Sequence, residues 1–170
     1  DRTTQHNSEP SAIISAQLNT TSGLVFMTEA MTEPQQLAGA LSGHFTLAIN
    51  KRDVDIGFNF YELQSDGKLF HFNNYVSRAS YAKDMSDRQL LTPHEKTIIP
   101  LVNGRMTAKI IGKGSRLVLV LDVNKNHNFQ VNLGTGKDVS EETIADAGEP
   151  LSIKWFSDSE IKIPLSPWTP

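Results

Sequence analysis

The 170-residue sequence contains no cysteine. Disulfides, thiol catalysis and cysteine-ligated zinc are therefore excluded, although this absence does not decide the cellular compartment. No apolar run approaches the roughly 20 residues that span a bilayer, and we identify no secretory signal peptide. The chain begins at Asp1 rather than at Met, so we expect a processed product or an excised piece of a longer protein.

Positive charge is also scarce. The formal net charge is −3, and the lysines and arginines are scattered along the chain. Binding to phosphate backbones requires a basic surface, so we expect neither nucleic acid nor a membrane as the main partner. The length suits one domain, which at this size removes roughly 70% of the unfolded chain's surface from water.

The apolar residues predict short strands. Residues 1–22 are polar apart from one apolar pair, and we expect an extended lead-in to a single domain over residues 23–170. Apolar side chains alternate at period two in residues 44–50 and 54–61, and Asp66-Gly67 predicts a hairpin. Strands recur at intervals of roughly 8–15 residues without βαβ alternation. We therefore predict an all-β antiparallel sandwich of the jelly-roll type with one short helix, at Val139 to Ala147, capped by Ser140.

Residues 113–137 combine a core strand with a polar loop. Leu117 to Leu121 are consecutive apolar residues, which predicts a strand buried on both faces. The following residues contain four asparagines, Asn124, Asn126, Asn128 and Asn132. Because β proteins often place recognition contacts in loops at the ends of rigid strands, these four are candidate interface residues.

The sequence offers no established catalytic or metal motif. No serine has glycine two residues before it and two residues after it, so the nucleophile elbow of α/β-hydrolases is missing. The histidines never have i, i+4 spacing. Asp122, Asn124 and Asn126 fit the start of a calcium loop, but His127 and Leu133 stand where the loop needs Gly and Glu. Gly134 to Lys137 lacks the full phosphate-loop spacing. We predict no metal and no cofactor.

Two further groups of residues are candidates for function. Asp53 and Asp55 would point to the same side of a strand, where paired carboxylates can share a proton or hold a cation. Their neighbours Lys51 and Arg52 favour a salt-bridged structural role instead. The aromatic residues expected to be exposed are a candidate sugar-stacking platform, although aromatics at period two are more often core. They are Tyr61, Tyr75, Tyr81, Trp155 and Trp168.

Six motifs, in order, resemble a known family. They are Gly23 to Glu29, Asp53-Val-Asp55 with the Asp66-Gly67-Lys68 turn, Arg78 to Tyr81, Gly114-Ser-Arg-Leu117, Asn132 to Gly136, and Ile161 to Leu165. This order is similar to that of the C-terminal non-catalytic domain of serine hydrolases related to X-Pro dipeptidyl-peptidases, cocaine esterase and glutaryl acylases. The chain departs from the family at residues 126–132, which lack its usual Pro, Asp and Arg residues.

The resemblance implies a jelly roll similar to galactose-binding domains, with the catalytic Ser, Asp and His in an upstream α/β-hydrolase domain of the same polypeptide. The domain would pack on that catalytic domain, shape the active-site entrance or take part in a homo-oligomer. The interface or entrance candidates are Asn124, Asn126, Asn128, Asn132, Asp53 and Asp55. Substituting Asn126 or Asn132 by Ala would then weaken docking or substrate specificity in the parent enzyme, while leaving the isolated fold nearly intact. The alternatives are a free-standing carbohydrate-binding module and a complete hydrolase with an unusual triad.

Overall fold

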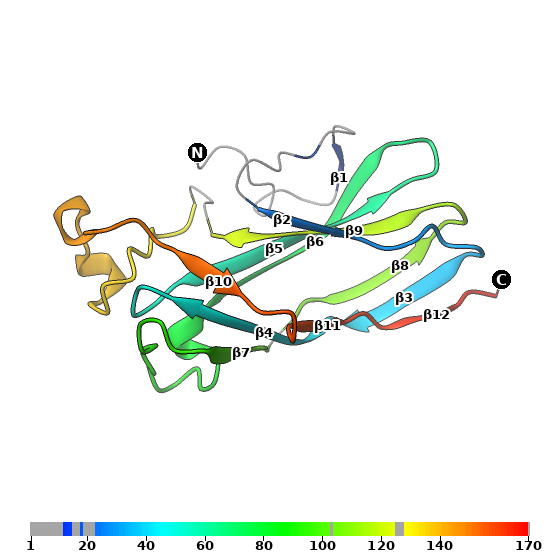
Figure 1. The fold of residues 1–170 in the computed structure, drawn as a ribbon. Coiled ribbons are helices and arrows are strands. Elements are labelled where there is room, and N and C mark those ends of the chain that lie inside the picture. Colours follow the sequence, from blue (N-terminus) through cyan, green and yellow to red (C-terminus); the bar gives the residue numbers. More distant parts are fainter. Residues whose placement is uncertain (1–11, 15–17, 19–22, 103, 125–127, 170) are drawn as a thin grey trace.

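The protein is a β-sandwich of antiparallel strands, seen in a computed structural model that describes residues 12–14, 18, 23–102, 104–124 and 128–169 (Figure 1). The first layer is a five-stranded sheet in the order β1-β6-β5-β9-β2, and every neighbouring pair is antiparallel. Its strands are β1 (Ala12–Ile14), β2 (Leu24–Met27), β5 (Asp55–Leu63), β6 (Leu69–Arg78) and β9 (Arg116–Val123). The predicted antiparallel sandwich is confirmed.

The second layer is built around two strands that follow each other in the chain, β3 (Gln35–Ala40) and β4 (Ser42–Ile49). On one side, β7 (Thr97–Leu101) pairs with β4 and β8 (Met106–Ile111) pairs with β3. On the other side, the C-terminal segment runs back along both strands in three short pieces. These pieces are β10 (Ile153–Trp155), β11 (Glu160–Lys162) and β12 (Leu165–Pro167).

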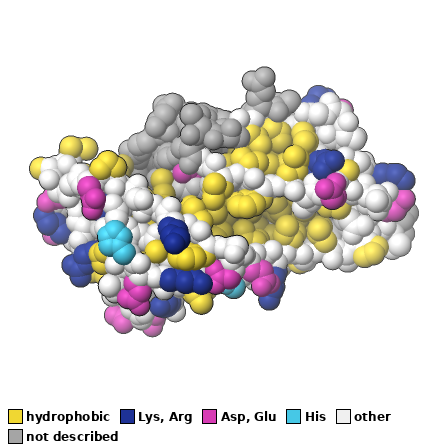
Figure 2. All heavy atoms as spheres, viewed as in Figure 1, with side chains coloured by type: hydrophobic (Ala, Val, Ile, Leu, Met, Phe, Trp, Pro, Cys, Tyr) yellow, Lys and Arg dark blue, Asp and Glu magenta, His cyan; other side chains and the backbone are white. Residues whose placement is uncertain are grey.

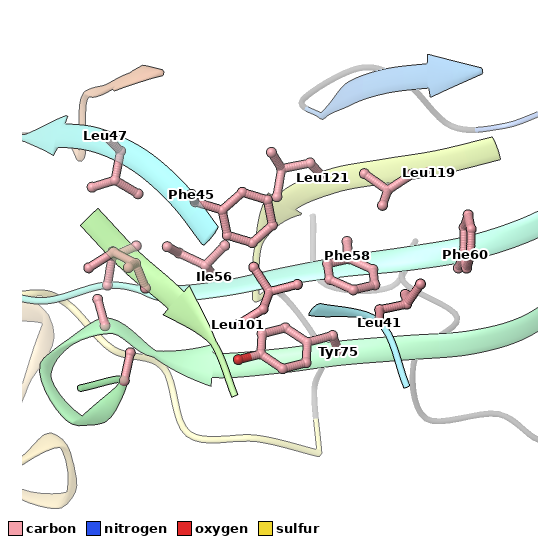
Figure 3. Packing of buried hydrophobic residues seen from close by; sticks show 14 of the residues in the cluster. Leu41, Phe45, Leu47, Ile56, Phe58, Phe60, Tyr75, Leu101, Leu119 and Leu121 are labelled. Atoms are coloured by element: carbon pink, nitrogen blue, oxygen red, sulfur yellow. The ribbon is translucent and has the colours of Figure 1, made fainter. Parts of the chain in front are cut away.

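The core fills the space between the layers (Figure 3). Phe45 of β4 meets Phe58 of β5 edge to face, with ring centroids 6.3 Å apart, and Phe58 stacks on Tyr75 at 5.3 Å. Leu117, Leu119 and Leu121 of β9 point into the same cluster. Burying one such side chain stabilises the fold by roughly 1.5–3 kcal/mol, so this cluster is the main source of cohesion between the layers.

Strand β9 is buried on both faces from Leu117 to Leu119, as its apolar run predicts, and Val120 is half-buried. Val118 belongs to a second cluster on the opposite face of the sheet, together with Tyr61 and Leu69. The predicted hairpin is also present, because Gly67 adopts φ +86° between β5 and β6 and the Gln64 amide donates to the Lys68 carbonyl. The register of this hairpin shifts by a bulge after Phe60.

The predicted helix at Val139 to Ala147 is wrong. The segment forms two separate 3₁₀ turns, η3 (Val139–Glu141) and η4 (Ile144–Asp146). Asp138, not Ser140, caps the first turn by accepting from the Ser140 amide. Thr143 and Asp146 then form a capping box that starts the second turn, so the side chains break the segment where a helix would continue.

Two smaller findings complete the fold. A strand at Gln35–Ala40 was not predicted, because the Pro34 turn and the glycine at position 39 obscured it. A further 3₁₀ turn, η2 (Ala79–Tyr81), follows β6. Within the described part of the chain, no helix has the length and apolarity needed to cross a membrane.

Candidate functional site

Asp53, just before β5, is a fully buried carboxylate. One of its oxygens accepts from the backbone amides of Val54 and Ser80, at 2.9 and 3.0 Å. The other accepts from the Ser80 hydroxyl at 2.7 Å and from the Arg88 guanidinium at 3.2 Å. Each oxygen therefore has two donors from this chain, which is the satisfied state that a buried charge requires. Asp53 has a structural role.

Asp55, the first residue of β5, forms a two-pronged ion pair with Arg78 of β6. The Nε and a terminal nitrogen of Arg78 donate to the two Asp55 oxygens at 2.8 and 3.0 Å. The hydrogen bond to Asp55 raises the pKa of Arg78 against the opposing effect of partial burial. The Asn132 side chain donates to the same carboxylate at 2.8 Å. The two predicted acidic residues are thus close together, and each is neutralised by its own arginine.

The loop that contains Asn132 is fastened to the sandwich. The Glu142 carboxylate accepts from the Leu133 amide at 2.6 Å and from the amide of Thr135 at 3.0 Å. The Arg52 amide donates to the Gly134 carbonyl at 2.9 Å. Gly134 has φ +74°, and a Cβ there would lie 2.7 Å from the Asp53 carbonyl oxygen, so only glycine fits. We call Asp53, Asp55, Arg78, Arg88, Asn132 to Gly136 and Glu142 the polar clamp.

Of the remaining predicted asparagines, Asn124 contacts the polar clamp through its backbone. The backbone amide of Asn124 donates to the Asp55 carbonyl at 2.7 Å, and Asn128 is exposed. Asn126 lies outside the described residues, as does His127 of the calcium-loop comparison. In the described portion of the chain, no three His, Asp or Glu side chains come together in a metal-holding arrangement.

A third buried carboxylate lies at the other end of β5. Glu62 is only 3% exposed, pairs with Lys109 of β8 at 2.9 Å and accepts from the Gly112 amide at 3.1 Å. Burial works against ionisation, but hydrogen bonds from Lys109, Ser115 and Gly112 outweigh it and hold the pKa of Glu62 below its ordinary value. This group joins the two layers.

The predicted exposure of two aromatic residues is wrong. Tyr61 is buried in the second cluster, and Tyr75 is buried in the main core, where its hydroxyl accepts from the Val102 amide at 3.2 Å. Trp155 is half-buried and meets the edge of Phe45 at 5.9 Å. Because Tyr61 and Tyr75 lie on opposite faces of the first sheet, these residues do not share one stacking platform.

An apolar groove is the feature that sequence reasoning missed. It has a volume of about 510 Å³ and lies between β2 and β9 of the first layer and β10 and β11 of the second. Figure 2 shows hydrophobic side chains gathered along this hollow. Its walls include the exposed Leu24, Phe26 and Met27 of β2 and the half-buried Ile161. The sequence LVFM predicts an ordinary strand, and no local signal indicates that its side chains face solvent.

A smaller pocket of about 370 Å³ lies beside the polar clamp. It is lined by polar and aromatic residues that include Asn74, Arg78, Tyr81, Arg105 and Phe129. Arg105 donates to the Asn74 side chain at 2.9 Å, and Arg78 is held by Asp55. The arginines that face this pocket are therefore engaged within the chain.

Comparison with known proteins gives likeness in structure only. No family model matches the chain, and no curated protein matches it. An α-amino acid ester hydrolase superposes with a TM-score of 0.77 at 18% identity, over 85% of this chain and 26% of that one. An aminopeptidase from a marine sediment archaeon, Thaumarchaeota archaeon, gives 0.76 at 16% identity, over 87% and 26%.

A CocE/NonD family hydrolase from Staphylococcus aureus gives a TM-score of 0.63 at 13% identity, over 86% of this chain and 31% of that one. The chain thus spans about a quarter to a third of the length of the solved hydrolases that it matches. At these identities the likeness concerns the fold. The chain has the β-sandwich fold of one part of these hydrolase chains.

Proposed function

We propose that this chain is the non-catalytic C-terminal domain of an α/β-hydrolase serine acylase, esterase or X-Pro dipeptidyl-peptidase-like enzyme. It packs on the catalytic domain and shapes the entrance of the active site or an oligomer contact. The observation that carries the proposal is the superposition of most of this chain on a minor part of several hydrolases. The six ordered sequence motifs support the same assignment.

The surroundings of the serines favour a non-catalytic role. Two of the described serines touch a buried carboxylate: the Ser80 hydroxyl donates to Asp53 at 2.7 Å, and Ser115 hydrogen-bonds to Glu62, whose other partners are Lys109 and the Gly112 amide. A catalytic serine needs a general base, usually histidine, to accept its proton, with the carboxylate behind that base. The group beside Ser80 is Arg88, which cannot accept a proton, and Ser80 is 1% exposed. We therefore assign Ser80 a structural role, as a hydrogen-bond donor to Asp53 of the polar clamp.

A hydrolysis assay tests this assignment. Two proteins are assayed, the 170-residue chain and the full polypeptide that contains it. Each is given α-amino acid esters, X-Pro amides and simple acyl esters as substrates. We expect turnover by the full polypeptide and none by the 170-residue chain. Turnover by the short chain that disappears in Ser80→Ala, with the fold retained by circular dichroism, would overturn the proposal in favour of a complete hydrolase.

The entrance role of the asparagine loop is a separate part of the proposal. Asn132 donates to Asp55 and accepts from the Gly134 amide at 2.9 Å, so Asn132→Ala removes structural bonds as well as any contact with a partner. Asn128 is exposed and serves as a second probe beside Asn126. We expect Asn126→Ala and Asn128→Ala in the full polypeptide to change substrate preference. Unchanged kinetics in both variants would remove the loop from the entrance.

The alternative, a carbohydrate-binding module, is favoured by one observation, the pocket lined by Tyr81, Arg78 and Asn74. Sugar sites combine an aromatic face with polar side chains, as this pocket does. Titration with mono- and oligosaccharides distinguishes the two functions. Saturable binding by the 170-residue chain that is lost in Tyr81→Ala would support the carbohydrate-binding module. No binding at millimolar sugar would support the non-catalytic hydrolase domain.

A further inference from the structure

We infer that the apolar groove between β2 and β11 seats an extended apolar segment of polypeptide, supplied by the part of the hydrolase that lies outside these 170 residues. This inference rests on the proposed function and names the surface through which the domain packs. It places the main contact on the apolar side chains of the groove rather than on the asparagine loop. The groove lies between β2 of the first layer and β11 of the second, as its lining residues show.

The hydroxyls of Ser159 and Thr28, which line the groove, are already used by this chain, which argues against a small polar ligand. The Ser159 hydroxyl accepts from the Thr46 amide at 2.9 Å and donates to the Phe156 carbonyl at 2.8 Å. The Thr28 hydroxyl accepts from the Leu117 amide at 3.0 Å and donates to the Glu29 carbonyl. Ligand pockets for sugars and metabolites need a few convergent polar groups to fix orientation. Here the walls present mainly carbon.

The charges around the groove are paired with one another. Lys113 pairs with Glu33 at 2.9 Å, Lys162 with Glu160 at 3.2 Å, and Arg116 with Glu29 at 3.6 Å. A surface that recruits a charged partner carries an excess of one sign. These three ion pairs balance one another, and Lys154 lies over the ring of Phe156 in the wall. The apolar walls therefore determine the chemistry of the groove and favour an apolar occupant.

Strand β2 adds a requirement that a polypeptide meets and a lipid does not. It is the last strand of the first sheet and pairs only with β9 among the described strands. In an antiparallel edge strand, alternate backbone N–H and C=O groups point away from the sheet and are open to pairing. A bound extended peptide can satisfy them while its side chains enter the groove, which is the usual mode of strand addition.

The comparisons indicate where that peptide comes from. The solved hydrolases cover 85–87% of this chain in the three cases described, but this chain covers only 26–31% of them. Most of each hydrolase therefore lies outside the matched domain. On this chain, Leu24 and Phe26 lie on the same face of β2, line the groove, and are 42% and 55% exposed. A contiguous apolar surface of this kind on a soluble domain marks a protein interface.

Site-specific thiol labelling tests the inference. Because the 170 residues contain no cysteine, an introduced cysteine is the one thiol that they offer to the reagent. Met27→Cys places a thiol on β2, at the border of the groove. Met106→Cys, at a residue that is 80% exposed on β8 and does not line the groove, is the matched control. Each variant is made in the 170-residue chain and in the full polypeptide, and the rate of maleimide labelling at that site is followed by mass spectrometry.

In the full polypeptide we expect Met27→Cys to label at least about tenfold more slowly than in the 170-residue chain, because protection follows burial under a stable partner. We expect Met106→Cys to change by less than about twofold, as its side chain stays in solvent. Equal rates for Met27→Cys in the two proteins, or equal slowing of both variants, would overturn the inference. If the full polypeptide hydrolyses its substrates but Met27→Cys is not protected, only the inference about the groove fails. If the full polypeptide does not hydrolyse any of them, the proposed function fails.

The same measurement recognises other occupants. If Met27→Cys in the 170-residue chain becomes protected as its concentration rises, the occupant is a second copy and the inference is overturned. If labelling of the dilute 170-residue chain is slow and becomes fast when residues 1–22 are deleted, the groove is assigned to that segment of the same chain, which also overturns it.

Discussion

The polar clamp and the apolar groove contrast in how they use their side chains. Asp53, Asp55 and Asn132 have the residue types of a binding site, yet their donors and acceptors are engaged within the chain. Leu24, Phe26 and Met27 have the residue types of a core, yet they are exposed. This contrast indicates that a binding surface of this domain is identified by side chains left unsatisfied in the isolated chain, and not by polar residue type. For an apolar side chain, unsatisfied means left in water.

The first way to test this contrast compares two phenylalanines that both line the groove. Phe45 is 2% exposed and Phe26 is 55% exposed. In the 170-residue chain we expect Phe45→Ala to lower the free energy of unfolding by about 3–5 kcal/mol. We expect Phe26→Ala to lower it by less than about 1 kcal/mol, since little area is buried. Urea unfolding measures both, and equal losses would mean that β2 belongs to the core.

The second test removes the centre of the polar clamp. Asp53→Ala leaves the Arg88 guanidinium and the Ser80 amide without their acceptor, so we expect a loss of about 3 kcal/mol in unfolding free energy. The control is Glu33→Ala, which breaks the exposed Lys113–Glu33 pair and should cost less than about 1 kcal/mol. An Asp53→Ala variant as stable as its control would show that the clamp is not structural.

A third test distinguishes two reasons why glycine is needed at position 134 of the polar clamp. One is the positive φ, and the other is the close approach of the Asp53 carbonyl oxygen. Gly134 and Gly67 both have positive φ, at +74° and +86°, but a Cβ meets the Asp53 carbonyl only at Gly134. We expect Gly67→Ala to cost about 1 kcal/mol and Gly134→Ala to cost about 2–3 kcal/mol. If thermal unfolding gives the same shift for both, the loop lies further from β5 than the structure shows.

The smallest expected effect is the pH dependence of Glu62. Its folded pKa is below the ordinary value of 4.5, so its ionised form stabilises the fold above that pH. This contribution falls as the pH drops below the ordinary pKa and through the lower folded pKa. Glu62→Gln should flatten the acid side of a stability–pH curve. A variant with the same acid dependence as the unsubstituted chain would assign that dependence to other carboxylates.

Sequence patterns predicted the sandwich well where one residue type decides the local structure. The alternating apolar residues of β5, the Asp66-Gly67 turn and the apolar run of β9 each appear as predicted. The structural role of Asp53 and Asp55 was favoured by the neighbouring charges, although their true partners are Arg88 and Arg78 rather than Lys51 and Arg52. Those partners are distant in sequence, so no local pattern could identify them.

The failures have physical reasons of the same kind. The segment Val139 to Ala147 has helical composition, but Glu142 bonds to the Leu133 and Thr135 amides instead of supporting a helix. Tyr61 follows Asn59 on the face of β5 that the alternation predicts to be polar, yet β5 is buried on both faces, so period two did not reveal the burial of Tyr61. The exposure of β2 depends on how the two layers separate, which is a tertiary property.

Amide hydrogen exchange tests the central contrast most directly, by comparing the 170-residue chain with the full polypeptide. The Leu133 and Thr135 amides, which donate to Glu142, should be protected equally in both proteins. The amides of Leu24 to Met27 should gain protection only in the full polypeptide, where a partner strand covers the edge. The opposite pattern, with unchanged exchange in β2 and new protection at residues 132–136, would contradict the account and return the interface to the asparagine loop.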